Sequence, residues 1–322
     1  MKESVYIESN GVLYRQGNTL YFINKEGKKP IPIENISDIY CHGKVSVKSG
    51  ASSLLMSSSV PVHFFNKFGF YEGSLYPRNF MNAGYVIVRQ VQYFLDKDRR
   101  RKIAAAIVEG IKHNILKVLE YYVSVGKDVH EHMNRISSEV IDGDIPRIMS
   151  SEGRIWSEFY NSFNKILDRF KMETREIRPP TNEVNALLSF GNSLLYATTL
   201  SEIYHTYLHP SISFLHEPEE QRFSLALDIA DIFKPVIVDR VIFTLVNNRI
   251  LNEDDFVRDV GVLLNDRGRR LFVREYQSKL DSTILHPILK RKVSYRFLIR
   301  LECYKLIKHV IEDQEYESFK MW

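Results

Sequence analysis

The N-terminal quarter of the chain consists of short apolar runs that partly alternate with polar residues. Six such runs are rich in β-branched and aromatic side chains: SVYIE, VLYRQ, TLYFI, ISDIYCH, KVSVK and VPVHFF. Their starts lie about ten residues apart, and glycines punctuate them. Asn10 followed by Gly11 is a dipeptide typical of a turn. Because β-branched and aromatic residues favour a pleated backbone, this region is predicted to form a small β-sandwich or a pair of curled sheets.

The remainder of the chain has apolar residues at three- and four-residue spacing, as on one face of a helix. The segments with this period include IAAAIVEGIKHNILKVLEYYV, ALLSFGNSLLYATTLSEIYH, RFSLALDIADIF and VIVDRVIFTLV. Thr181 or Asn182 is the expected N-cap of the second of these segments. Residues 291–313, RKVSYRFLIRLECYKLIKHVIED, are predicted to form one long amphipathic helix.

These two patterns divide the chain into two parts. Pro77 in LYPRNF breaks the strand pattern, and a linker is expected near residues 75–85. The predicted fold class is α+β, with a small N-terminal β-sandwich-like domain at residues 1–78 and a larger all-α C-terminal domain at residues 79–322. A chain of 322 residues is long enough for two such cores.

Composition narrows the classes of protein that fit this sequence. No apolar run reaches the length of about 18 residues that a membrane span needs, and the start, MKESVYIESNG, lacks the basic and apolar regions of a signal peptide. We therefore expect a cytoplasmic protein without a membrane partner. Cys41 and Cys303 stand far apart and without CxxC spacing, which indicates neither a zinc site nor a disulfide framework.

Positive charge is modest overall but clustered. The formal net charge is +4, which is compatible with nucleic-acid binding without demanding it. One basic run is contiguous: Arg99, Arg100, Arg101 and Lys102. A second lies between His286 and His309 and has only Glu302 as an acid: Lys290, Arg291, Lys292, Arg296, Arg300, Lys305 and Lys308. Each run alone is typical of a solvated helix face, whereas two in one chain favour a polyanionic partner.

Two acids interrupt an apolar helical segment and form the first candidate site. Asp228 and Asp231 in SLALDIADIF lie one helical turn apart and face the same side. Carboxylates among apolar side chains need a partner, which can be an ion pair, a cap or a metal. His216 precedes them, and Glu152 lies in a segment with apolar neighbours. One imidazole with carboxylates suits Mn²⁺ and accepts Mg²⁺.

Simpler interpretations of these residues remain open. Glu152 could instead cap a helix or pair with Arg147 or Arg154, and a single histidine such as His216 more often lies in a core or on a surface than on a metal. The EPEE run after His216 is typical of a solvated turn. The HEH triplet at 130–132 is not expected to bind metal, because residues two apart on a helix do not face each other.

The ordered motifs resemble the CRISPR-associated protein "one" family of spacer-acquisition nucleases. The matching segments in the helical part are SSEGRIWSEFY, RPPTNEVNALLSFGNSLLYA, LHP, SFLHE and SLALDIADIFKPVIVDR. In the N-terminal part they are ISDIYCHGKVSVKSG and VPVHFFNKFGFYEG. The resemblance therefore covers nearly the whole chain, and the succession Glu-Gly, Leu-His-Glu and Leu-Asp-x-x-Asp-x-Phe-Lys-Pro is much more specific than any one motif.

The resemblance implies particular roles for the site residues. It places the metal ligands on Glu152, His216 and Asp231 and a further active-site acid on Asp228, while Lys234 lies one turn from Asp231 and could bind the same phosphate. Four positions depart from the family pattern. Asp231 and Lys234 stand where many members have Glu and Arg, and they keep the charge. His209 and Ser213 stand where Asp or Asn and Gly are common, and they affect the loop before His216.

The resemblance also implies an activity and partners. The expected activity is that of a metal-dependent DNA endonuclease and integrase, which uses Mg²⁺ or Mn²⁺ and inserts spacer DNA into a CRISPR array. The nucleophile is a DNA 3′-hydroxyl, and water in its place gives hydrolysis. The expected partners are prespacer and repeat DNA, a second copy bound through the β domain, and a small ferredoxin-like CRISPR-associated subunit. Arg99, Arg100, Arg101, Lys102, Lys290, Arg291 and Lys292 are the predicted DNA-binding residues.

Two other functions remain possible on sequence grounds. One is a stand-alone metal-dependent nuclease that acts on branched DNA in repair, and the other is a non-enzymatic DNA-binding scaffold. The scaffold has no need for acids in an apolar helix, so Asp228 and Asp231 argue against it. The residues do not separate the nuclease from the integrase.

Overall fold

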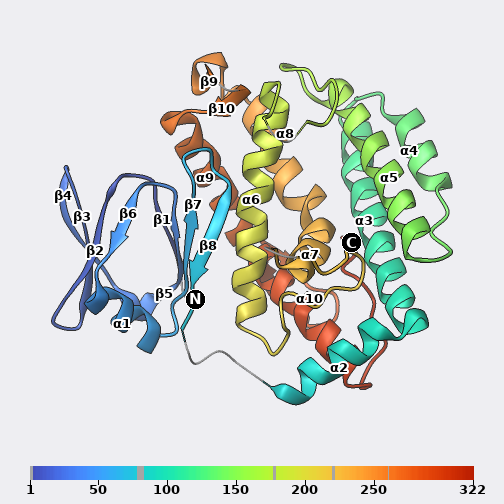
Figure 1. Cartoon of the computed structure of the whole chain (residues 1–322). Helices are drawn as coiled ribbons and strands as arrows, with labels where there is room; N and C mark the ends of the chain where they lie inside the picture. The colour runs from blue at the N-terminus through green and yellow to red at the C-terminus, as the bar shows by residue number, and fades with distance from the viewer. Residues whose placement is uncertain (1–2, 78–82, 177–178, 220–221, 260) are drawn as a thin grey trace. The chain divides into compact units, whose positions relative to one another are not determined.

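A computed structural model describes residues 3–77, 83–176, 179–219, 222–259 and 261–322 (Figure 1). The chain divides into two compact units, Met1–Asn82 and Ala83–Trp322. The predicted boundary between residues 78 and 79 lies outside the described residues. The first unit is rich in strands and the second is mainly helical, as the α+β prediction requires.

The described part of the N-terminal unit contains two four-stranded sheets. One has the order β1-β5-β7-β8 and the other β4-β3-β2-β6. The six strands expected from the sequence are all present: β1 (Glu3–Ile7), β2 (Gly11–Gln16), β3 (Thr19–Asn24), β5 (Ile36–Cys41), β6 (Val45–Val47) and β7 (Val62–Phe65). β1, β5 and β7 run parallel, whereas β2 and β3 are antiparallel. The core between them includes fully buried Leu13, Leu20, Ile39 and Leu55.

Three elements of this unit lack the expected apolar alternation. Strand β4 (Gly27–Ile31) is largely exposed and carries Pro30, which a sheet tolerates because β4 lies at an edge. Strand β8 (Tyr71–Leu75) contains Gly73 and only partly buried apolar residues. Helix α1 (Ser49–Ser57) is rich in serine. A 3₁₀ turn, η1 (Ile33–Asn35), precedes β5.

The C-terminal unit is built from helices with two small hairpins. Its helices are α2 (Gly84–Leu95), α3 (Lys97–Ser124), α4 (His130–Ser138), α5 (Ile145–Ile166), α6 (Glu183–Tyr204), α7 (Ser224–Phe233), α8 (Arg240–Asn247), α9 (Asp266–Asp281) and α10 (Tyr295–Val310). A π-helical turn, η2 (Pro235–Asp239), joins α7 to α8, and a 3₁₀ turn, η3 (Glu253–Asp255), precedes the first hairpin. None of the described helices is long and apolar enough to cross a membrane.

The hairpins correct two sequence-based expectations. Strands β9 (Phe256–Asp259) and β10 (Gly261–Leu264) pair with each other, as do β11 (Thr283–Leu285) and β12 (Lys292–Ser294). The unit is therefore not all-α. The predicted helix at residues 291–313 begins only at Tyr295, because its first residues form β12 and Ser294 caps α10 by accepting the N–H of Phe297 at 3.2 Å. The spacing of apolar residues alone could not distinguish this short strand from the start of the helix.

Helix α6 is the buried centre of the C-terminal unit. Nearly all of its residues are buried, and it contacts α7, α8, α10 and the π-turn η2 (Figure 1). Asn182 caps its start by accepting the N–H of Asn185 at 2.9 Å, which confirms the N-cap prediction at this position. Gly191 permits the close approach of η2, since a Cβ there would lie 2.6 Å from Val238 and 2.8 Å from Phe272.

This close approach predicts the effect of one added methyl group. Gly191→Ala should lower the free energy of unfolding by about 1–3 kcal/mol, because η2 or Phe272 must shift to admit it. Gly153→Ala is the matched control, since Gly153 is also helical but, among the described residues, nothing beyond its chain neighbours and its own helix backbone lies within 4 Å of an added Cβ. The control should be neutral or stabilise by up to about 1 kcal/mol. Urea unfolding of both variants makes the comparison, and equal stabilities would contradict the packing argument.

Candidate active site

Asp228 is the point from which the site is built. It is fully buried on α7, and its carboxylate accepts three backbone N–H groups from residues 214–216. The distances are 2.6 Å from Phe214, 2.9 Å from Leu215 and 3.0 Å from His216. These residues have no helix or strand of their own. The buried carboxylate therefore fixes an irregular loop that cannot satisfy its own donors.

The same carboxylate orients the imidazole of His216. Nδ1 of His216 lies 2.8 Å from Oδ1 of Asp228, and the opposite ring nitrogen, Nε2, lies 3.9 Å from Oδ2 of Asp231. Burial acts to lower the pKa of His216, but the hydrogen bond and charge of Asp228, with Asp231 and Glu152, outweigh it and raise the pKa to about 9. His216 is thus aimed at Asp231, while Asp228 is occupied with positioning.

Glu152 joins this group from helix α5. The side chain of Trp156, one helical turn later, hydrogen-bonds to the carboxylate of Glu152. Burial, followed by the charge of Asp231, raises the pKa of Glu152 to about 7, although Lys234 and His216 act in the opposite direction. Two acids from different helices are thus held close together in a partly buried place, where a further positive charge would be stabilising.

Lys234 supplies positive charge to the group. It forms an ion pair with Oδ1 of Asp231 and lies 5.5 Å from the centre of the Trp156 ring. Asp231 is nearly fully buried, and within the described ranges this oxygen has no partner with hydrogen-bond geometry. Among the described residues, no three His, Cys, Asp or Glu side chains form a preassembled metal-binding group. The donor types suit a divalent cation, but Lys234 and Asp231 contact each other in this arrangement.

Arg100 has a different role from the DNA contact that its sequence suggested. It is buried on α3 and donates to the carbonyl oxygens of Phe214, at 2.8 Å, and Leu215, at 3.5 Å. It also pairs with Glu217 at 2.8 Å. Its guanidinium is therefore turned inward and supports the loop that carries His216. The sequence contained a signal, because Arg100 continues the buried helical period of Ile103, Ala104 and Ile107.

The other predicted DNA-binding residues lie at the surface to different degrees. Arg99 pairs with Asp96 at 3.3 Å and with Glu312 at 2.9 Å. Arg101 lies 4.0 Å from Asp98 and 3.7 Å from Asp142. Arg101 is partly buried, whereas Lys102, Lys290, Arg291 and Lys292 are all exposed. The two basic runs belong to different elements, since one opens α3 and the other ends the loop of the β11–β12 hairpin and begins β12.

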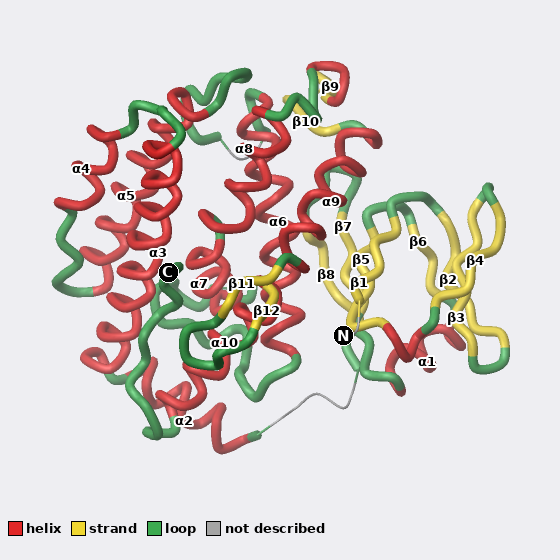
Figure 2. The backbone as a smooth tube through the Cα atoms, turned by 180° about the vertical axis from the view of Figure 1, so that it is seen from behind, coloured by secondary structure: helices red, strands yellow, loops and turns green. Residues whose placement is uncertain are grey.

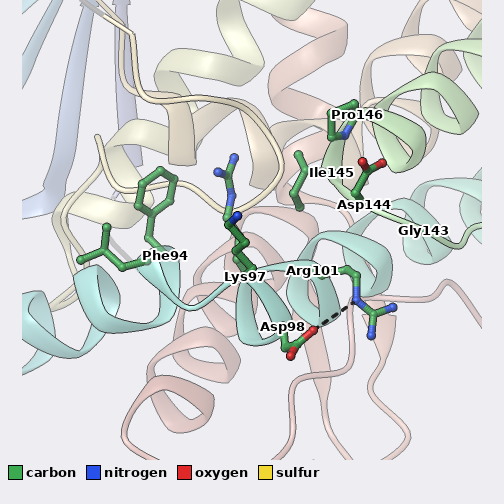
Figure 3. Close-up of a pocket in the computed structure, with 10 residues that line it drawn as sticks. Phe94, Lys97, Asp98, Arg101, Gly143, Asp144, Ile145 and Pro146 are labelled. Carbon is green, nitrogen blue, oxygen red and sulfur yellow. Dashed lines mark ion pairs between the residues drawn. The ribbon is translucent and has the colours of Figure 1, made fainter.

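A pocket of about 730 Å³ opens beside the start of α3. Figure 3 shows Phe94 and Lys97 on one side of it and the segment from Gly143 to Pro146 on the other. Arg100, which also lines the pocket, lies 4.4 Å from the centre of the Phe94 ring. The pocket thus adjoins the residue that supports the His216 loop, with the side chains of Lys97 and Arg101 among its lining.

A second buried polar group was not predicted from the sequence. Asp239, at the end of the π-turn, is buried, and in the described part of the chain neither of its carboxylate oxygens has a hydrogen-bond partner. Burial raises the pKa of Asp239 to about 8, against the opposing charges of Lys234 and Arg175. Arg175 hydrogen-bonds to Tyr160 and to Asn185 of α6. The signal in the sequence was a single acid in the apolar run PVIVDRVIF.

Comparison with known proteins gives a consistent result over the whole chain. The profile of the family described as "CRISPR associated protein Cas1" matches residues 5–278. A relative from Thermodesulfovibrio yellowstonii, named CRISPR-associated endonuclease Cas1 3, is 45% identical and covers 98% of both chains. The structure of a CAS1 protein from Thermotoga maritima is 38% identical, covers 98% of this chain and 100% of its own, and has a TM-score of 0.87.

Two more distant structures share the fold alone. A casposase bound to its integration product has a TM-score of 0.83 at 20% identity and covers 99% of this chain and 93% of its own. A chain of a Cas6-RT-Cas1–Cas2 complex has a TM-score of 0.86 at 18% identity and covers 100% of this chain and 36% of its own. All three solved structures thus share the fold of this chain.

The contacts of Asp228 predict that two neighbouring acids differ in their effect on stability. Asp228→Asn should lower the free energy of unfolding by about 2–4 kcal/mol, because an amide oxygen cannot satisfy all the donors that surround it. Asp231→Asn should change it by less than about 1 kcal/mol, since the lost ion pair with Lys234 is offset by weaker repulsion of Glu152. Urea unfolding in the presence of a chelator measures both.

A titration of His216 by NMR provides the control for this pair. In Asp228→Asn the pKa of His216 should fall from about 9 toward its ordinary value, because the charged hydrogen-bond partner is lost. The positioning role of Asp228 is wrong if the two variants unfold alike and the His216 titration does not move.

Proposed function

The chain belongs to the CRISPR associated protein Cas1 family, and from this premise we propose that it is a metal-dependent DNA endonuclease and integrase of CRISPR adaptation. The observation that carries the proposal is the convergence of Glu152, His216 and Asp231 from two helices and a loop, with Lys234 beside them. A DNA-binding scaffold has no use for such a group.

The residues fit a divalent cation by their chemistry. Two carboxylates and one imidazole nitrogen are ligands that Mn²⁺ and Mg²⁺ accept. Burial, followed by the charge of Asp231, raises the pKa of Glu152, and a nearby cation would favour its charged form. Glu152, His216 and Asp231 are the residues that would hold the ion, and Asp228 would keep the His216 ring in the required tautomer. A bound ion would polarise the phosphodiester and stabilise charge on the leaving oxygen.

Lys234 has two possible partners in this scheme. In the described arrangement it pairs with Asp231, which a divalent cation would neutralise instead. The ammonium group would then be free to bind the phosphate that undergoes reaction. Lys234 also acts on the buried Asp239, since its charge and that of Arg175 oppose the rise in the pKa of that carboxyl.

The reaction needs no nucleophilic side chain. The oxygen of a DNA 3′-hydroxyl forms a new bond to phosphorus as the bond to the leaving oxygen breaks, and the hydroxyl proton is lost while the leaving oxygen gains one. One phosphodiester replaces another, so no external energy source is required. Water in place of the 3′-hydroxyl gives hydrolysis by the same site, which accounts for the endonuclease name of the relative.

DNA and protein partners follow from the same proposal. Prespacer and repeat DNA would contact exposed cations such as Lys102, Lys290, Arg291 and Lys292. A homodimer formed by the β domain and a small ferredoxin-like Cas2 subunit would complete the assembly. The likeness to a chain of a Cas1–Cas2 complex supports the second partner.

Single substitutions in the convergent group should abolish both reactions. Asp231→Asn, His216→Ala and Glu152→Ala should each lower hydrolysis and strand transfer by at least about 100-fold, because loss of a ligand is more severe than the 10–100-fold loss seen when a ligand's supporting partner is removed. The assay uses a short duplex with a supercoiled plasmid that carries the repeat, with and without the partner subunit, after chelation and add-back of Mn²⁺ or Mg²⁺.

The matched control for these variants is Glu131→Gln, an exposed acid on α4, which should retain full activity. Circular dichroism should show the native fold for every variant. Full activity in folded Asp231→Asn or His216→Ala protein would overturn the proposal. Hydrolysis without strand transfer in the wild type, under all conditions, would favour the stand-alone nuclease.

Metal binding should strengthen as pH rises. The pKa values of about 7 for Glu152 and about 9 for His216 mean that protons occupy these ligands near neutral pH, and a cation must displace them. Affinity for Mn²⁺ should therefore increase between about pH 6 and pH 9, with release of about one to two protons per ion at pH 7. Isothermal titration calorimetry in two buffers of different ionisation enthalpy measures the release, and pH-independent affinity would contradict this ligand set.

A further inference from the structure

The hairpin formed by β11 and β12 presents an ordered loop (Figure 2). Its ladder continues beyond the strands, since the N–H of His286 donates to the carbonyl of Arg291 at 2.9 Å. The N–H of Lys290 then donates to the carbonyl of His286 at 2.9 Å and closes the turn. Nδ1 of His286 lies 3.2 Å from the backbone nitrogens of both Ile288 and Leu289. The loop backbone is therefore held by its own hydrogen bonds.

The side chains of this loop are apolar and face solvent. Ile288 is 82% exposed, Leu285 61% and Leu289 41%. The His286 ring anchors the loop to the C-terminal residue, with its centre 5.3 Å from the Trp322 ring. A bulky side chain fixed at the tip of a structured hairpin with so little burial gains nothing for folding. Its exposure is more readily explained by an interaction with a partner.

The charge around the tip identifies the partner. Lys290, Arg291 and Lys292 directly follow Leu289, are all exposed, and take part in none of the ion pairs found among the described residues. Residues 282–301 contain no acid at all. The next two cations of this segment are already engaged, since Arg296 and Arg300 bind Glu202 of α6 at 3.5 and 2.6 Å. The free cations therefore gather at the exposed apolar tip.

We propose that the β11–β12 hairpin enters the minor groove of duplex DNA, with Ile288 as a wedge against a base step and Lys290, Arg291 and Lys292 on the flanking phosphates. Proteins that kink DNA insert apolar side chains in this way, because stacked bases offer an apolar surface between two rows of phosphate charge. A flat acidic protein surface would match the cations but not the protruding isoleucine. The inference rests on the proposed function, which makes duplex DNA a substrate.

The competing occupant is a protein. A hollow of about 420 Å³ lies beside the hairpin, between His286–Leu289 and the C-terminal residues Phe319 and Trp322. Acids such as Glu315 and Glu317 also line this hollow, so it is less suited to DNA than the tip is. Binding of a protein segment there is treated as an alternative outcome of the experiment.

The test uses the full-length chain and a linear duplex that carries a donor dye and an acceptor dye at its two ends. Wild-type protein should bend the duplex by about 20° or more, and netropsin, which occupies the minor groove, should compete for binding. Ile288→Ala should abolish the bend and weaken binding by up to about tenfold. The triple change Lys290→Ala, Arg291→Ala and Lys292→Ala should lower the slope of log affinity against log salt by up to about 2.7.

Val140→Ala is the matched control, because Val140 is 73% exposed in the same unit but belongs to the connection between α4 and α5 instead of the hairpin. It should bend and bind DNA as the wild type does. All variants should melt at the wild-type temperature, since the altered side chains are exposed.

The outcomes separate this inference from the proposed function. Wild-type protein that transfers strands but does not bend DNA, or an Ile288→Ala variant that bends it fully, would overturn the hairpin's role and leave the enzyme assignment standing. An Ile288→Ala variant that bends DNA but fails to dimerise or to bind the partner subunit would assign the tip to a protein interface. A wild type that bends DNA through Ile288 but catalyses neither reaction would support the hairpin and refute the enzyme.

Discussion

The buried carboxylate of Asp228 is the constraint on which the catalytic arrangement depends. It lies on an apolar helix, where an uncompensated charge would be strongly destabilising, and three loop N–H groups and one imidazole compensate it. The dependence is mutual, because residues 214–216 have no regular structure that could satisfy those donors. Arg100 completes the arrangement from the other side by binding two carbonyl oxygens of the same loop. The segment that carries His216 is thereby held by hydrogen bonds at its N–H groups and at its carbonyl oxygens.

The second constraint is the packing of α6 against the π-turn. Gly191 lets Val238 and Phe272 approach the helix backbone, and the π-turn in turn separates Lys234 from α8. The Lys234 side chain contacts Asp231 and Trp156, while Asp239 at the other end of the turn is buried. Close packing between apolar elements thus sets the positions of the charged groups around the site.

The sequence contained enough information for the outline of this structure. Strands with clear alternation, the N-cap at Asn182 and the shared helical face of Asp228 and Asp231 were all predictable, because each depends on local pattern. The edge strand β4 was not, since its pairing with β3 overrides its polar composition. The different roles of Asp228 and Asp231 were also hidden, because they arise from loop donors that are distant in the sequence. Arg100 was predicted as a surface cation because it stands in a basic run; its helical period indicated burial, but its partners lie more than a hundred residues away.

The π-turn limits the mutations that this part of the chain can tolerate. A π-turn holds one residue more than an α-turn and is equivalent to a single insertion in a continuous helix. Each residue advances an α-helix by about 100°, so deletion of one residue from Pro235–Asp239 would restore a regular helix and rotate α8 by that angle relative to α7. The apolar face of α8 would then leave the core, or Lys234 and Asp231 would leave the site. A substitution in this segment changes local contacts, whereas a deletion would rotate the whole of α8. The length of the π-turn therefore sets the rotation of α8 relative to the site residues on α7.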